Sequence, residues 1–199
     1  MLVSTAIVAH STRKAQAFDL AITLDASIAY DLGDCGPGVN HRRAWQLANT
    51  PAADWVCVIE DDAILCTDFR AQLEQTLSTA PTPVVSLYLG TGYPLHLVEV
   101  AQRAADQAAS RGEQWITLPT CNHAVALCIR QDLVADMLEH TESSSLPIDE
   151  AIGAWARDRR RQISYPVVSL VDHADGPTVI AHPDGIARTR ARRAIKFEG

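Results

Sequence analysis

Short apolar runs along the chain alternate with segments whose apolar residues recur every three or four positions. The runs, which are rich in β-branched residues and bounded by polar or turn-forming ones, predict strands at residues 2–9, 20–24, 55–59, 84–89, 115–118, 124–129 and 165–171. Helical spacing predicts helices over residues 39–49, 95–110 and 132–140 and after Thr67 and Pro147. Strands that alternate with helices indicate an α/β fold, with a mainly parallel central sheet flanked by helices.

Size and composition fit one globular domain. The chain has 199 residues, of which 47% are hydrophobic and 21% charged, and this excludes disordered and fibrous classes. No apolar run approaches the roughly 20 residues of a membrane span, and the first residues lack the features of a signal peptide. We therefore expect a cytoplasmic protein without a transmembrane segment. The five cysteines have no CxxC spacing, which argues against a disulfide framework or a zinc cluster.

Charge is unevenly distributed along the chain. The net charge is −7, yet the last part is basic, with arginine-rich clusters at residues 157–161 and 188–196. Such clusters attract phosphate-bearing partners, although a tail that is merely solvated explains them equally well. We expect a domain over residues 1–178 followed by a basic tail over residues 179–199.

An acidic triplet, Glu60, Asp61 and Asp62, directly follows the apolar run at 55–59. Neighbouring carboxylates at the end of a buried strand repel each other and need a countercharge. Hard divalent cations such as Mg²⁺ and Mn²⁺ supply one, since they take oxygen ligands. Alternate residues of an extended segment point the same way, so Glu60 and Asp62 would share one face and Asp61 would lie on the other. A solvated acidic turn is the alternative.

The loop after the first predicted strand contains His10, Thr12 and Arg13. Ligands of parallel sheets bind beyond the carboxyl ends of the strands, and an arginine there could pair with a phosphate or a carboxylate. A solvated loop is the alternative interpretation.

Two further acids, Asp149 and Glu150, follow Pro147 in the first turn of a predicted helix. Acidic residues are favoured at a helix N-terminus for electrostatic reasons alone. A carboxylate in this position could instead act as a general base that removes a proton from an acceptor hydroxyl. Asp149 is the preferred candidate for that role.

Residues 36–62, GPGVNHRRAWQLANTPAADWVCVIEDD, resemble the family 2 glycosyltransferases of the GT-A fold. The shared features are a glycine-containing loop, an Asn and an Arg on a helix, an apolar strand and a D-x-D-type motif, here with Glu60 as its first acid. Asp25 resembles the Asp of the second strand in that fold, which contacts the nucleotide base. The residues that we expect at the nucleotide sugar, partly on this resemblance, are His10, Thr12, Arg13, Asp25, Asn40, Arg43, Glu60 and Asp61.

Residues 122–173 are similar to the C-terminal half of the bacterial lipooligosaccharide and procollagen galactosyltransferases. In those proteins a strand and a helix precede a P-x-D segment and a late strand. The resemblance implies that His173, which follows the last predicted strand, joins Asp62 and Glu60 as a ligand of Mn²⁺ or Mg²⁺.

Together the resemblances cover about residues 2–178 and imply a GT-A-like domain. They imply metal-dependent transfer of a hexose from a nucleoside-diphosphate sugar, with a UDP-sugar as the expected donor, to an acceptor hydroxyl with inversion. The basic end fits an anionic acceptor such as DNA, a lipid-linked glycan or a protein, and a homo-oligomer could complete the acceptor site of this short chain. The alternatives are a sugar-nucleotidyltransferase, which would want a glycine-rich loop where residues 10–14 have none, and a non-catalytic nucleotide- or nucleic-acid-binding protein.

Overall fold

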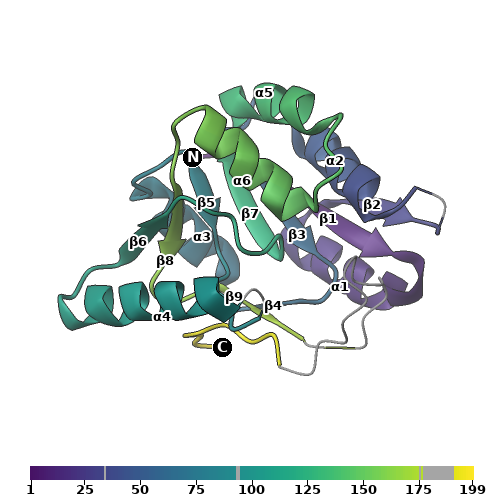
Figure 1. The fold of residues 1–199 in the computed structure, drawn as a ribbon. Coiled ribbons are helices and arrows are strands. Elements are labelled where there is room, and N and C mark those ends of the chain that lie inside the picture. The colour runs from purple at the N-terminus through teal and green to yellow at the C-terminus, as the bar shows by residue number, and fades with distance from the viewer. Residues whose placement is uncertain (34, 93–94, 175, 177–190) are drawn as a thin grey trace.

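The computed structural model describes residues 1–33, 35–92, 95–174, 176 and 191–199, and its main sheet has seven strands in the order β2-β1-β3-β7-β5-β8-β6 (Figure 1). The strands are β1 (Val3–His10), β2 (Ser27–Asp31), β3 (Trp55–Glu60), β5 (Val84–Ser86), β6 (Trp115–Leu118), β7 (Ala126–Arg130) and β8 (Ile163–Pro166). β6 and β7 run against the other five strands. The expected α/β class with a mainly parallel central sheet is confirmed.

Helices cover both faces of the sheet. They are α1 (Lys14–Leu24), α2 (Pro37–Ala48), α3 (Phe69–Ser78), α4 (Leu95–Ser110), α5 (Gln131–Thr141) and α6 (Ile148–Asp158). One buried core contains the inner residues of α1 and α3, and the other contains those of α2, α4, α5 and α6. Successive residues of β1 alternate between the two cores, as the period of a strand requires: Ala6 and Val8 face one, Ile7 and Ala9 the other.

Trp45 of α2 and Trp155 of α6 are fully buried in the core. Within the part of the chain that the structure describes, no helix combines the length and the apolar character needed to cross a bilayer.

Two sequence-based strand assignments are wrong. Residues 20–24 form the end of α1, and the second strand is β2, which begins at Ser27. The predicted strand over residues 165–171 is divided. β8 ends at Pro166, and Val171 instead begins β9 (Val171–His173), which pairs with β4 (Ala63–Leu65) in a separate two-stranded sheet.

The last nine residues pack against the domain. Ala194 forms a bridge with Gly90, Phe197 forms one with Ser169, and the Ile195 N–H donates to the Leu89 carbonyl at 2.8 Å. The described part of the expected tail is therefore integrated into the fold. Arg188 and Arg190, from the second basic cluster, lie outside the described residues.

Candidate functional site

A cavity of about 670 Å³ opens at the carboxyl edge of the sheet. The parallel strands β1, β2 and β3 end there at His10, Asp31 and Glu60, and all three residues line it. The N-terminal parts of α2 and α6, the loop before β7, His173 and Arg192 complete the walls. Its volume lies in the range of small-molecule sites, and its position is the one in which sheets of this kind bind ligands.

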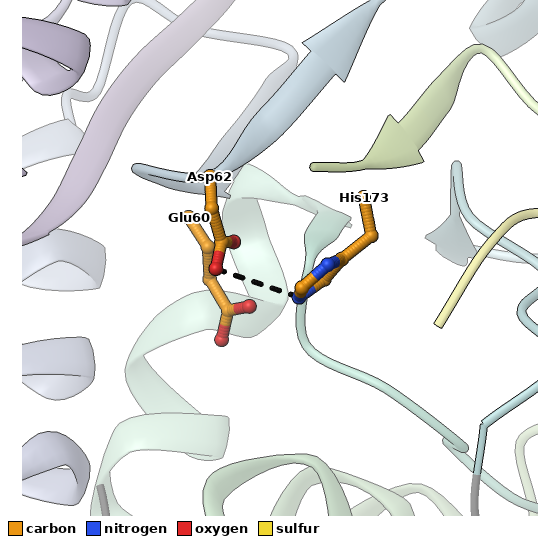
Figure 2. A group of neighbouring side chains, drawn as sticks. All are labelled: Glu60, Asp62 and His173. Atoms are coloured by element: carbon orange, nitrogen blue, oxygen red, sulfur yellow. Dashed lines mark ion pairs between the residues drawn. The ribbon is translucent and has the colours of Figure 1, made fainter. Parts of the chain in front are cut away.

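Glu60, Asp62 and His173 form a cluster at this cavity whose candidate ligand atoms all lie within 4.8 Å of one another (Figure 2). The Nε2 atom of His173 is 3.4 Å from Oδ2 of Asp62. The β4–β9 pairing creates this proximity because it sets Ala63 opposite His173, and the Ala174 N–H donates to the Asp62 carbonyl at 2.9 Å. Glu60 is the last residue of β3 and Asp61 and Asp62 form the turn that follows, so Glu60 and Asp62 meet through this turn and not through strand alternation.

The donor atoms of this cluster fit a divalent cation. Oδ1 of Asp62 is buried and has no hydrogen-bond partner among the described residues, a costly state for a carboxylate oxygen. Burial and the neighbouring charge of Glu60 raise the pKa of Asp62. Burial alone would also raise the pKa of Glu60, but the hydrogen bond and charge of His41 and the charge of His173 outweigh it and lower that pKa. Two carboxylates and an imidazole around an unpartnered oxygen can hold Mg²⁺ or Mn²⁺.

Arg13 supplies a countercharge that the sequence analysis did not assign to the triplet. Its Nη1 lies 3.0 Å from Oδ1 of Asp61 and 2.6 Å from Oδ2 of Asp62. Asp61 also accepts the N–H of His10 at 2.8 Å through Oδ2. Asp61 thus anchors the end of β1 and the loop that carries Arg13, while Asp62 belongs to the cluster with Glu60 and His173.

Two neighbouring residues of α2 support the cavity floor. Nδ2 of Asn40 donates to the carbonyls of Ala9 and Ala29 at 3.1 and 3.0 Å, which ties the ends of β1 and β2 together. His41, which sequence reasoning missed, places Nε2 3.1 Å from Oε1 of Glu60. The sequence did contain a signal for this position. His41 precedes Ala44 by three residues in the helix, and this spacing places both on the same, inner face.

Asp149 lines the cavity from the first turn of α6, and burial raises its pKa to about 6, with smaller contributions from the charges of Glu60 and Glu150. Its Oδ1 accepts the N–H of Glu150 at 3.0 Å. The Glu150 side chain is exposed and does not line the cavity. Of the two candidate bases, the geometry favours Asp149.

Three predicted contacts do not line the cavity. Asp25 ends α1 with φ 51° and therefore precedes β2, at the sheet edge opposite the site. Arg43 directs Nη1 toward Sγ of Cys35 at 3.2 Å, and the exposed Thr12 bonds Nδ1 of His10 through its hydroxyl at 2.8 Å. Asp31 lies in the cavity wall at the carboxyl end of β2. It was missed because the second strand was assigned to residues 20–24.

His123 and Arg192 form another part of the wall. Burial lowers the pKa of His123 to about 4, so its imidazole is neutral at neutral pH, and its Nε2 has no hydrogen-bond partner among the described residues. Gly92 packs against both side chains: a Cβ there would be tight against Cε1 of His123, at 3.3 Å, and in ordinary contact with Cγ of Arg192, at 3.6 Å. The lining of the cavity thus includes a cationic side chain as well as carboxylates.

Comparison with known proteins finds similarity of fold. The crystal structure of A197 from STIV aligns with a TM-score of 0.52 at 12% sequence identity, over 94% of this chain and 92% of that chain. This likeness shows a shared fold and nothing finer. The structure of CMP:2-keto-3-deoxy-manno-octonic acid synthetase complexed with CTP aligns with a TM-score of 0.40 at 10% identity, over 83% of this chain and 89% of that chain, too low to carry an argument. No family model and no curated protein matches the sequence.

Proposed function

We propose that the protein is a metal-dependent glycosyltransferase that moves a sugar from a nucleoside-diphosphate sugar to an acceptor hydroxyl. The observation that carries this proposal is the meeting, in one cavity, of the Glu60, Asp62 and His173 cluster with the half-buried carboxyl of Asp149. A cation site and a separate carboxylate with a pKa near neutrality are the two groups that inverting glycosyl transfer needs.

The donor would lie with its diphosphate beside the cluster. Glu60, Asp62 and His173 would hold Mg²⁺ or Mn²⁺, whose chemistry is to neutralise the charge that grows on the departing diphosphate. Arg192 lines the same cavity and adds a guanidinium that can donate to phosphate oxygens. The resemblance to UDP-sugar-dependent enzymes makes a UDP-sugar the first donor to test.

Asp149 would take the proton of the acceptor hydroxyl. Its Oδ1 is held by the N–H of Glu150, which leaves Oδ2 to accept that proton. With a pKa of about 6, the carboxyl is mostly ionised at neutral pH and still more basic than an exposed aspartate. The acceptor oxygen would attack the anomeric carbon from the side opposite the diphosphate, which inverts the configuration at that carbon.

The alternative enzyme, a sugar-nucleotidyltransferase, would bind a nucleoside triphosphate and release pyrophosphate. In this chain Arg13, the arginine of the loop after β1, is paired with Asp61 and Asp62. Its charge is therefore shared with these two carboxylates and is not reserved for a triphosphate. A non-catalytic nucleotide-binding protein would need no group such as Asp149 with a raised pKa.

The test is a screen of nucleotide sugars with and without Mn²⁺, with nucleoside triphosphates plus sugar 1-phosphates in a parallel arm. We expect Mn²⁺-dependent release of a nucleoside diphosphate, which Asp62→Ala abolishes. Release of pyrophosphate in the parallel arm would instead indicate a nucleotidyltransferase. Binding of nucleotide sugars without turnover in the presence of varied acceptors would indicate a binding protein.

A further inference from the structure

Residues 191–197, here called the clasp, lie across the strand that carries His173. The Thr91 N–H donates to the Arg193 carbonyl and the Ile195 N–H to the Leu89 carbonyl, both at 2.8 Å. The Ser169 N–H donates to the Lys196 carbonyl at 2.9 Å. Figure 1 shows this segment in yellow beside β9 and β4. The clasp is thus bonded to two segments of the domain.

The strongest contacts of the clasp go to Asp172, the residue before His173. The Asp172 carboxylate is buried, at 3% exposure. Its Oδ1 accepts the N–H groups of His173 and Ala194 at 2.8 and 2.6 Å, and its Oδ2 lies 2.7 Å from Nη2 of Arg193. Nη1 of Arg193 also donates to the His173 carbonyl at 3.1 Å. The two arms of one guanidinium therefore hold both the residue before His173 and the backbone of His173 itself.

We propose that the clasp, through Arg193, is what holds His173 in the metal-binding cluster, so that cation binding and docking of the clasp are coupled. This inference rests on the metal site of the proposed function. β9 has only three residues and pairs on one edge with β4. Without Arg193, the carboxylate of Asp172 would stay buried without its ionic partner, a state that destabilises the segment around it. His173 is the last residue of that segment.

Coupling of this kind is reciprocal. If the docked clasp favours the cation by a given factor, the bound cation must favour the docked clasp by the same factor. A bound cation should therefore stabilise the docked backbone of the clasp, just as the docked clasp raises the affinity for the cation. If Arg193 served only the stability of the fold, cation binding and docking of the clasp would not be linked.

The first experiment measures Mn²⁺ affinity from the electron paramagnetic resonance signal of the free ion. We expect Arg193→Gln to weaken binding by about 10-fold or more, on the scale found for groups that orient a metal ligand. Arg193→Lys, which keeps the charge, should recover part of the loss. The matched control is Arg159→Gln, which removes a 2.6 Å ion pair with Asp136 outside the cavity lining and should leave Mn²⁺ affinity unchanged.

The second experiment uses the unaltered protein, and so does not depend on the folding of any variant. Hydrogen exchange is followed by mass spectrometry with and without saturating Mn²⁺. The amides of Ala194 and Ile195 donate to Asp172 and Leu89, and we expect the ion to slow their exchange.

Unchanged Mn²⁺ affinity in Arg193→Gln, or exchange at the clasp that Mn²⁺ does not alter, would overturn the proposal and leave glycosyl transfer standing. Arg193-dependent Mn²⁺ binding in a protein that turns over no nucleotide sugar would contradict glycosyl transfer and support the clasp. A wild-type protein that binds no Mn²⁺ would overturn the metal site and the clasp proposal with it.

Discussion

Ala63 lies directly opposite His173 in the antiparallel β4–β9 pair, and this register brings the His173 imidazole beside Asp62. A register shift of one residue would turn the side chain of a strand to the other face. The pairing of two three-residue strands therefore sets the register in which the imidazole of His173 lies beside the acidic triplet.

Asp62→Ala should abolish Mn²⁺-dependent binding of a nucleoside diphosphate while the protein stays folded. Arg13 keeps its 3.0 Å pair with Asp61, so the loop after β1 retains an anchor. Calorimetric titration with UDP and Mn²⁺ measures the loss, and thermal unfolding checks the fold. Asp19→Ala, an exposed acid on α1, is the matched control. Wild-type affinity in Asp62→Ala would remove Asp62 from the metal site.

Asp149→Asn should lower the transfer rate by about 10² to 10⁴-fold, the usual contribution of a general base. Donor affinity should stay unchanged, because the variant keeps the shape of the side chain and its bond to the Glu150 amide. Glu150→Gln, whose side chain lies outside the cavity lining, should stay near the wild-type rate. Rates and donor affinities of both variants, measured side by side, test this ranking. The opposite ranking would make Glu150 the base.

The pH profile of transfer should show an acid limb with an apparent pKa of about 6, the value to which burial raises Asp149. Only the ionised carboxylate can accept a proton, so the rate should fall as the pH drops below 6, by about tenfold per pH unit. Initial rates between pH 4.5 and 8, with metal in excess, give the profile. A limb that persists unchanged in the residual activity of Asp149→Asn would assign it to another group.

Arg192→Gln should weaken UDP binding by about 10- to 100-fold, the range of a lost hydrogen bond to a charged group. Affinity for uridine, which carries no phosphate, should not change. Arg103→Gln on the exposed surface of α4 removes the same charge outside the cavity and serves as the control. Equal losses for UDP and uridine would mean that Arg192 shapes the wall and does not bind phosphate.

Asn40→Ala should destabilise the fold by about 1–3 kcal/mol for each buried partner left unsatisfied. The variant removes the amide that donates to the Ala9 and Ala29 carbonyls. Urea unfolding measures the free energy of unfolding, with Gln107→Ala, an exposed residue of α4, as a surface control. A loss of donor affinity at unchanged stability would instead support the contact between Asn40 and the nucleotide sugar that we expected from the sequence.

The parts of the site that the sequence predicts depend on local geometry. The acidic triplet directly follows a buried strand, which places it at the strand's carboxyl end. The expected alternation is not observed, because Asp61 and Asp62 form a turn and both pair with Arg13. The end of a parallel strand also predicts the edge of the sheet where the cavity lies. The prediction of His173 as a metal ligand rested on the resemblance to galactosyltransferases and not on its spacing from the acidic triplet. The glycosyltransferase resemblance itself stays a prediction.

The parts that the sequence does not predict depend on packing between distant elements. In α1 the buried face is made of Ala17, Ala21 and Leu24, while the larger Ile22 is 65% exposed, so the run at residues 20–24 gives a strand-like signal. This one error moved the expected second-strand acid to Asp25. Arg13 meets Asp61 and Asp62 only because β1 and β3 are adjacent and in register. No sequence spacing carries that information.

The position of the clasp also bears on the order in which the molecule folds. Thr91 and Arg193, which bond to each other, are 102 residues apart in the chain. The entropy of closing so long a loop must be overcome before the contact contributes to stability. The β1–β3 half of the sheet, by contrast, closes over much shorter distances with α1 and α2. A chain with that half already formed would hold Glu60 and Asp62, with His41 beside Glu60, but not the imidazole of His173. We therefore expect the ability to bind a cation to appear with the final docking steps of folding.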